Sequence, residues 1–216
     1  MPGVFRVVTV AREYGSGGGP IAQKLAQRLG WDLLDNALIT RIAQTSKVDR
    51  RVCQQFDEAV DSWLHRLTKR AFGGGAFEGV AAPSVFDSDA VANLSRHLIE
   101  EAAKIGNCVI VGRGGQCVLQ GRADVFHVFV YAPMQERVRR VRERFGEAHA
   151  KPEIIRASDR ERAAYVKHHY QCEWCNPHLY DAMFTSTLGE ENVVDAILAA
   201  MRTHAKVPED AHAKRA

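Results

Sequence analysis

Residues 7–22 read VVTVAREYGSGGGPIA and indicate how the fold begins. A run of apolar, mostly β-branched residues leads into a glycine-rich turn, and a segment with helical apolar spacing follows. A continuous apolar run is typical of a strand that is buried on both faces. Glycines allow backbone N–H groups to converge on an anion, and a following helix directs its positive end to the same point. The candidate phosphate-binding residues are Gly15, Ser16, Gly17, Gly18 and Gly19.

The same loop also has a purely structural interpretation, because a tight turn that packs a strand against a helix needs glycines too. The loop contains no lysine, and Pro20 follows its last glycine. Proline is well placed in the first turn of a helix, where the backbone N–H has no partner to lose. We therefore expect a helix over residues 20–29 that stops at Gly30.

Outward from this unit, apolar strand-like runs alternate with helical segments. Further strands are expected within residues 31–35, 107–115, 125–133 and 183–189, and helices within residues 36–71, 88–105, 134–147, 152–171 and 191–204. This alternation predicts an α/β fold of three layers with a central parallel sheet. Ligands bind such sheets beyond the C-terminal ends of the strands. Two of those ends, at residues 12–19 and 112–115, are rich in glycine, which favours a ligand site there.

The composition is that of one soluble globular domain. The chain has 216 residues, of which 46% are hydrophobic and 25% charged, with a net charge of +3. Such a mild positive charge suits small anionic ligands and predicts no nucleic-acid partner. No apolar stretch approaches the ~20 residues that span a bilayer, so no membrane partner is expected. The odd number of cysteines, five, and the lack of a signal-peptide pattern favour reduced thiols and a cytoplasmic location.

Residues 7–41, VVTVAREYGSGGGPIAQKLAQRLGWDLLDNALITR, resemble the opening of the cytidylate kinases and their relatives. In that family a strand leads to a loop of the form G-P-S-G-A-G-K-G-T, and a segment L-D-S-G-A-I-Y-R follows the next helix. The resemblance is closer to a cytidylate kinase-like group whose loop reads S-R-E-Y-G-S-G-G-R. Arg12 falls at the first loop glycine of the cytidylate kinases, Gly18 at their lysine and Pro20 at their threonine. Gly19 stands where the cytidylate kinase-like group commonly has arginine.

Further stretches match in the same order, so the resemblance covers residues 5–204. CVIVGRGG (108–115) resembles a strand that ends in G-R-D, with Gly114 in place of the aspartate. HVFVYAPMQERVRRV (127–141) resembles a strand with the helix that enters a lid, and IIRASDRERAAYVKHHY (154–170) resembles an arginine-rich lid. LYDAMFTSTLG (179–189) resembles the last strand.

The resemblance implies one P-loop kinase-like domain over residues 1–204, with a core of residues 1–43 and 93–204. A helical insertion like those that bind nucleoside monophosphates is expected at about 44–92, and a lid at about 145–172. Residues 205–216 are expected to form a disordered tail. The substrate-binding residues that the resemblance implies are Asp35, Asn36, Arg41, Arg113, Asp159 and Arg162.

The implied activity is ATP-dependent, Mg²⁺-dependent phosphoryl transfer to a nucleoside monophosphate, with CMP or dCMP favoured. Two alternatives stay open. One is a non-catalytic nucleotide-binding or sensor protein on the same fold, and the other is a kinase for a different small acceptor. The expected partners are small nucleotides, and a homodimer stays open.

Phosphoryl transfer needs positive charge at the transferring group, and without a loop lysine this charge must come from arginines. We favour Arg12, which lies inside the loop, with Arg156 and Arg160 closing from the lid as the catalytic set. The arginines within residues 137–144 surround one helix, so most of them are expected to be solvated. No metal ligand is assigned, although Asp35 could hold Mg²⁺ through water or simply contact the substrate.

CEWC (172–175) has the cysteine spacing of a zinc or redox site. His168, His169 and His178 could complete a set of two cysteines and two histidines. The resemblance, however, implies that this stretch corresponds to a family segment, W-x-D-P-x-x-Y-D, that ordinarily binds no metal. We therefore expect no zinc at CEWC.

Overall fold

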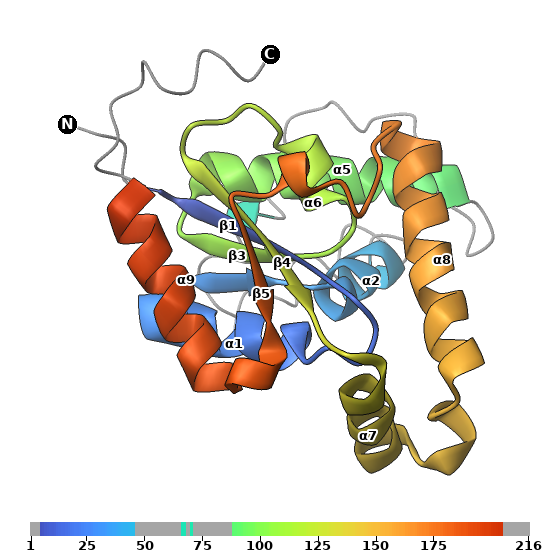
Figure 1. The fold of residues 1–216 in the computed structure, drawn as a ribbon. Coiled ribbons are helices and arrows are strands. Elements are labelled where there is room, and N and C mark those ends of the chain that lie inside the picture. Colours follow the sequence, from blue (N-terminus) through green and yellow to red (C-terminus); the bar gives the residue numbers. More distant parts are fainter. Residues whose placement is uncertain (1–4, 46–65, 68–69, 71–87, 205–216) are drawn as a thin grey trace.

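A computed structural model describes residues 5–45, 66–67, 70 and 88–204 (Figure 1). Its centre is a five-stranded sheet in the order β2-β3-β1-β4-β5, and each neighbouring pair is parallel. The strands are β1 (Val7–Arg12), β2 (Asp32–Leu34), β3 (Cys108–Val111), β4 (Val125–Tyr131) and β5 (Ala182–Thr185). Helices cover both faces, so the predicted three-layer α/β fold with a central parallel sheet is confirmed.

One face of the sheet packs against the first and last helices, α1 (Gly18–Leu29) and α9 (Glu190–His204). Successive strand residues point to opposite faces, and Val8 and Val10 of β1 are fully buried on this side. Ile21 and Leu25 of α1 pack against them. The pairing of strand and helix on either side of the glycine loop fixes the direction in which α1 points.

The opposite face is covered by α2 (Asn36–Thr45), α5 (Ser88–Ile105) and the short helix α6 (Gly115–Val118). Val7 of β1 faces this layer, and Leu98 of α5 is fully buried in it. Because β1 is covered on both sides, its sequence is a continuous apolar run and not an alternating one.

A separate segment extends beyond the sheet and returns to it (Figure 1). It consists of α7 (Met134–Phe145), the 3₁₀ helix η1 (Glu147–His149) and the long helix α8 (Pro152–Tyr170). Val166 of α8 joins Ala11, Phe129, Trp174 and Tyr180 in a small apolar cluster near the ends of β1 and β4. This packing places α8 beside the C-terminal ends of β1 and β4, at the edge of the sheet where the glycine loop begins.

Two boundaries differ from the sequence-based expectation. Helix α1 begins at Gly18, two residues before the predicted start, with Pro20 in its first turn as expected. The last strand ends at Thr185 instead of continuing to residue 189, because a 3₁₀ helix, η3 (Ser186–Leu188), follows at once. The Thr185 hydroxyl accepts the Thr187 N–H at 3.4 Å and caps that turn. A second 3₁₀ helix, η2 (Pro177–Leu179), precedes β5.

Several predicted features fall on residues that the structure does not describe. The tail at 205–216 lies outside the described residues, as does most of the insertion at 44–92. The division into core, insertion and lid therefore stays a prediction. In the part of the chain that the structure describes, no helix is long and apolar enough to cross a membrane.

Candidate functional site

The glycine loop joins the C-terminal end of β1 to the N-terminal end of α1. Gly17 caps α1 with a φ of 82°, in the left-handed region that favours glycine. The first N–H groups of a helix have no intrahelical partner, and the helix dipole favours negative charge beside them. The Ser16 hydroxyl is buried and has no hydrogen-bond partner among the described residues. The loop therefore presents unpaired donors to an anion.

Arg137 of α7 holds this loop in place. Its side chain is 6% exposed, and its Nε donates a hydrogen bond to the Tyr14 carbonyl at 2.8 Å. Its guanidinium also lies 3.4 Å from the Glu13 carboxylate and donates to the carboxylate of Asp159 on α8. The other Asp159 oxygen accepts the Tyr14 N–H at 2.8 Å. Arg137 and Asp159 thus bind the loop backbone to both α7 and α8.

Two further contacts fix the ends of the loop. The Glu13 carboxylate accepts the Ala132 N–H at 3.0 Å, which joins the loop to the end of β4. Arg140 of α7 donates to the Ser16 carbonyl at 2.8 Å and to the Ser186 hydroxyl at 2.6 Å. The loop is therefore bonded to its neighbours on the side that faces α7, where Gly15 also packs closely, since a Cβ on it would lie 2.9 Å from the Arg137 carbonyl oxygen.

A cavity of about 290 Å³ opens beside the loop, and its lining includes Ala11 and Arg12 from the end of β1. Val111 at the end of β3 and the residues that follow it form a second part of the wall. Helix α8 contributes Arg162 and Tyr165, so one wall belongs to the predicted lid. The cavity thus lies at the C-terminal strand ends, where parallel sheets bind their ligands.

Positive charge is concentrated at this cavity, because Arg12, Arg113 and Arg162 all line it. Burial, followed by the charges of Arg162 and Arg113, lowers the pKa of Arg12 to about 10, and Asp35 acts in the opposite direction. Burial also lowers the pKa of Arg162, which Asp159 opposes. With a pKa of about 10, Arg12 is charged at neutral pH. Like charges brought together out of water favour a compensating anion, so this arrangement suits a phosphate group.

Two buried nitrogen donors of residues that line the cavity have no hydrogen-bond partner among the described residues. They are Nε of Arg113 and Nε2 of Gln116. Arg113 also has a φ of 52°, which is uncommon for a residue other than glycine, and its guanidinium lies 5.7 Å from the centre of the Tyr165 ring. Unusual backbone conformations persist where the surrounding structure imposes them, often at ligand sites. A bound anion would give both donors an acceptor.

The predicted substrate-binding residues divide into two groups. Asn36, Arg113 and Arg162 line the cavity. Asp35 caps α2 by accepting the Leu38 N–H at 2.8 Å, and its charge acts on the neighbouring Arg12. Asp159 lies 3.1 Å from the Arg162 guanidinium and is already bonded to Arg137, so it positions these arginines. Arg41 belongs to α2, but its side chain lies outside the described residues.

The predicted catalytic set is only partly brought together. Arg12 lines the cavity, and its side chain also packs against Gly18 of the loop, so it touches both parts of the site. Arg156 and Arg160 lie on α8 with exposed side chains, and neither lines the cavity. Arg162 of the same helix lies where a lid arginine was expected.

Gly114, which replaces an aspartate in the resemblance, is covered by Tyr170. A Cβ at this position would lie 2.2 Å from Cε2 of the Tyr170 ring, and the residue has a φ of 74°. An aspartate could therefore not be placed here without displacing the Tyr170 ring. In this chain an aromatic ring therefore occupies the space where the resemblance places a carboxylate.

Sequence reasoning did not identify Glu13, Gln116 and Tyr165 as site residues. The role of Arg137 and Arg140 in holding the loop backbone was not predicted either. For Arg137 one signal was present in the sequence. It stands four positions before the apolar residue Val141, which is buried, and residues four apart lie on the same face of a helix.

Comparisons with known proteins bear on the family and the fold of the chain. A model of the cytidylate kinase-like family matches residues 7–188. A crystal structure of an uncharacterized protein from Eubacterium ventriosum superposes with a TM-score of 0.66 and 22% identity, covering 91% of this chain and 98% of that chain, which shows a shared fold. The shikimate kinase from Acinetobacter baumannii in complex with shikimate gives a TM-score of 0.49 at 13% identity, covering 94% and 96% of the two chains. A search of curated proteins finds no match to the chain.

Proposed function

The chain belongs to the cytidylate kinase-like family, and we propose that it transfers the γ-phosphoryl group of ATP to a nucleoside monophosphate, CMP or dCMP being favoured. The observation that carries this proposal is the convergence of Arg12, Arg113 and Arg162 on one cavity beside the glycine loop. A nucleoside monophosphate has the negative charge that these guanidiniums require. One guanidinium group can donate hydrogen bonds to two oxygens of the same phosphate. Such a pair of bonds fixes the orientation of the acceptor phosphate as well as binding it.

The loop would hold the donor. The unpaired N–H groups at the start of α1 and the buried Ser16 hydroxyl fit the phosphates of ATP. Arg12 then supplies the charge that a loop lysine provides elsewhere, since its side chain lies against Gly18 and also reaches the cavity. Transfer of a phosphoryl group needs this positioning and charge more than covalent chemistry.

Mg²⁺ accompanies ATP in phosphoryl transfer and neutralises charge on the phosphates. The loop offers it no hydroxyl at position 20, because Pro20 stands where the cytidylate kinases have threonine. Asp35 is the acid whose charge acts on Arg12, and its second role as the cap of α2 holds it in a fixed position. We propose that the ion is held mainly by the nucleotide, with Asp35 contributing through water.

Helix α8 would exclude water from the transfer. It brings Tyr165 and Arg162 to the cavity and is tied to the loop through Asp159. Arg156 and Arg160 stay candidates for closure from the same helix, although their side chains are exposed in this arrangement. Their role would require α8 to move when nucleotide binds.

The first experiment is calorimetric titration of Mg-ATP into the purified full-length chain. We expect micromolar to low-millimolar binding, and loss of about tenfold in affinity for Arg12→Ala, since hydrogen bonds to charged groups contribute about 1.5–3 kcal/mol. Arg139→Ala is the matched control, because this arginine lies on α7 with half of its side chain exposed and pairs with Glu136 and Glu143. Unchanged affinity in Arg12→Ala would remove Arg12 from the proposed set.

A coupled kinase assay over the nucleoside monophosphates then tests the acceptor. Turnover with CMP or dCMP above the other monophosphates supports the proposal. Turnover with another small acceptor would keep the enzyme class and replace the substrate. Gly114 is the position that favours this second result, because the tyrosine beside it fills the space of the family's aspartate.

A non-catalytic nucleotide sensor is the second candidate function. The observation that favours it is the loop itself, in which Gly18, Gly19 and Pro20 lack the side chains that related enzymes use. The prediction specific to this candidate is ATP or monophosphate binding without turnover on any acceptor. Absence of ATP binding at millimolar concentration would mean that the donor site does not function in the free protein.

A further inference from the structure

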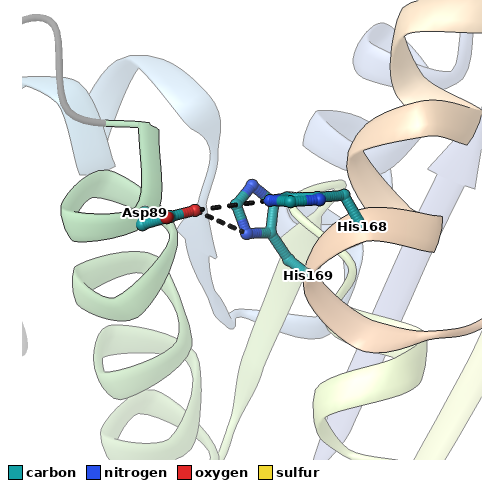
Figure 2. A group of neighbouring side chains, drawn as sticks. All are labelled: Asp89, His168 and His169. Carbon is teal, nitrogen blue, oxygen red and sulfur yellow. Dashed lines mark ion pairs between the residues drawn. The ribbon is translucent and has the colours of Figure 1, made fainter.

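A cluster of possible metal ligands lies at the last turn of α8, away from the glycine loop. His168 and His169 are neighbours on α8, and both face Asp89 in the first turn of α5. Figure 2 shows the two imidazole rings directed at one carboxylate oxygen. That oxygen, Oδ1 of Asp89, lies 3.5 Å from Nε2 of His168 and 3.5 Å from Nδ1 of His169.

We propose that Asp89, His168 and His169 bind a zinc ion that joins α5 to the end of α8. Two imidazole nitrogens and one carboxylate oxygen are ligands that zinc accepts in proteins, with a fourth position open to water. The three ligand atoms come from two different helices, so the ion would cross-link them. CEWC contributes nothing to this cluster, which separates the site from the cysteine motif in the sequence.

The spacing of the ligand atoms supports the proposal. Zinc binds histidine nitrogen and carboxylate oxygen at about 2.0–2.2 Å in tetrahedral geometry, which places ligand atoms ~3.4 Å apart. Both distances from Asp89 to the histidines are 3.5 Å. All three ligand atoms lie within 4.8 Å of one another. Rotation of exposed side chains by a small amount would complete the geometry, because Asp89 and His168 are both exposed.

The positive charge of Arg96 on α5 would repel a metal ion at this cluster. Its guanidinium, however, already donates to the His169 carbonyl at 3.1 Å and lies 5.1 Å from the centre of the Tyr170 ring. Its charge is therefore directed at those partners.

The consequence for the molecule is mechanical. Tyr170, which follows His169, is the ring that packs over Gly114 at the cavity. An ion at the proposed site would hold the last turn of α8 against α5 and so stabilise this wall of the cavity. The inference does not depend on which reaction the cavity performs, because none of its ligands lines the cavity.

The test is zinc titration of the full-length chain, made without a histidine tag and stripped of metal with a chelator. We expect the wild type to bind one equivalent of zinc. Asp89→Asn and His168→Gln should not bind it, and the fold should tolerate both substitutions because these positions are exposed. His169→Gln should lose it as well. His178→Gln and Cys175→Ser are matched controls, since these exposed residues lie beside CEWC, and both should keep the equivalent. Zinc should also raise the thermal midpoint of the wild type and not that of Asp89→Asn.

Two results would overturn the proposal. One is zinc binding by Asp89→Asn and His168→Gln that equals the wild type, which would place any zinc elsewhere in the chain. The other is absence of zinc binding by the wild type at micromolar concentration, which would leave a simple ion pair between the helices. Substitution with Co²⁺ adds a spectroscopic check, because cysteine ligands produce thiolate charge-transfer absorption that a site of histidine and carboxylate lacks.

Discussion

The side chain of Arg12 lies where a side chain at position 18 would have to begin. A Cβ on Gly18 would be 2.5 Å from Cβ of Arg12 and 2.9 Å from its Cγ, closer than nonbonded carbon atoms approach. The resemblance places a lysine at position 18 in the cytidylate kinases and a glycine at position 12. In this backbone, therefore, an arginine at position 12 and a lysine at position 18 exclude each other.

This relationship predicts the effect of restoring the lysine. Gly18→Lys alone should destabilise the protein by about 1–3 kcal/mol, the range for overpacking a well-filled site. Arg12→Gly removes the clashing atoms, so the double variant should lose less stability than the two single variants together. Urea unfolding of all four proteins gives this coupling energy. Additive losses would show that the loop moves to admit both side chains.

Position 19 behaves in the opposite way. No atom lies within 4 Å of a Cβ placed on Gly19, and the residue is exposed. Gly19→Arg should therefore fold normally, with a gain of about 0.5–1 kcal/mol from helix propensity. The new charge stands beside the phosphate loop, so Mg-ATP should bind more tightly and the gain should shrink as salt is added.

Gly19→Ala is the control for this prediction, because it has the same helix propensity effect without the charge. Calorimetry in low and high salt separates the two contributions. An affinity in Gly19→Arg equal to that of Gly19→Ala would mean that the donor phosphates do not lie at the start of α1.

Arg137 predicts a different kind of loss. It is buried and bonded to the Tyr14 carbonyl, Glu13 and Asp159, so Arg137→Met would take one charged partner from each carboxylate and the side-chain bond from the carbonyl. Breaking a buried ion pair by removing one partner costs about 3–5 kcal/mol. Arg139→Met on the same helix removes only exposed pairs and should cost less than about 1 kcal/mol.

Unfolding in urea measures both variants. Nucleotide affinity adds a second readout, since Arg137→Met removes the bond from α7 to the Tyr14 carbonyl and Arg139→Met leaves it intact. Equal stability of the two variants would show that the loop is held by its own turn and by Arg140.

The strands were predictable from the sequence because burial on both faces leaves a continuous apolar signal. The stretches around Val8, Val109 and Val128 are each buried in the structure, and each was identified as a strand. The residue at which the last strand ends was harder to predict from the sequence. Thr185 has a side chain suited both to a strand and to capping the turn that follows, and only the second role ends the strand there.

The arginines of α8 show what sequence pattern alone does not resolve. Arg160 and Arg162 are two positions apart, which places them about 200° apart around a helix, so they cannot face the same cavity. Helical periodicity therefore places Arg160 and Arg162 on opposite faces of α8. It does not predict which of these faces lies against the strand ends, because that depends on the packing of Val166 against Ala11 and Phe129. The cavity-facing member is Arg162.

The buried imidazole of His127 predicts how the fold responds to acid. Its Nδ1 lies 2.7 Å from the Thr9 hydroxyl, with which it shares a hydrogen bond across β1 and β4. Burial lowers the pKa of His127, although Asp181 opposes the shift. The unfolded chain takes up this proton near pH ~6.5, whereas the folded protein does so only at lower pH. The stabilising contribution is therefore complete above about pH 6.5 and is lost as pH falls toward the folded-state pKa.

Urea unfolding of the wild type at pH 7.5 and pH 5.5 should show this loss, and the double variant Thr9→Val/His127→Leu should show less of it. Replacing both partners of a buried hydrogen bond with apolar groups avoids leaving either one unsatisfied. The double variant is expected to be less stable at pH 7.5 because the new side chains fit the site less well, but its stability should change less between the two pH values. A loss on acidification as large as in the wild type would assign the effect to other groups, and the pKa of His127 would then be the same in the folded and unfolded states.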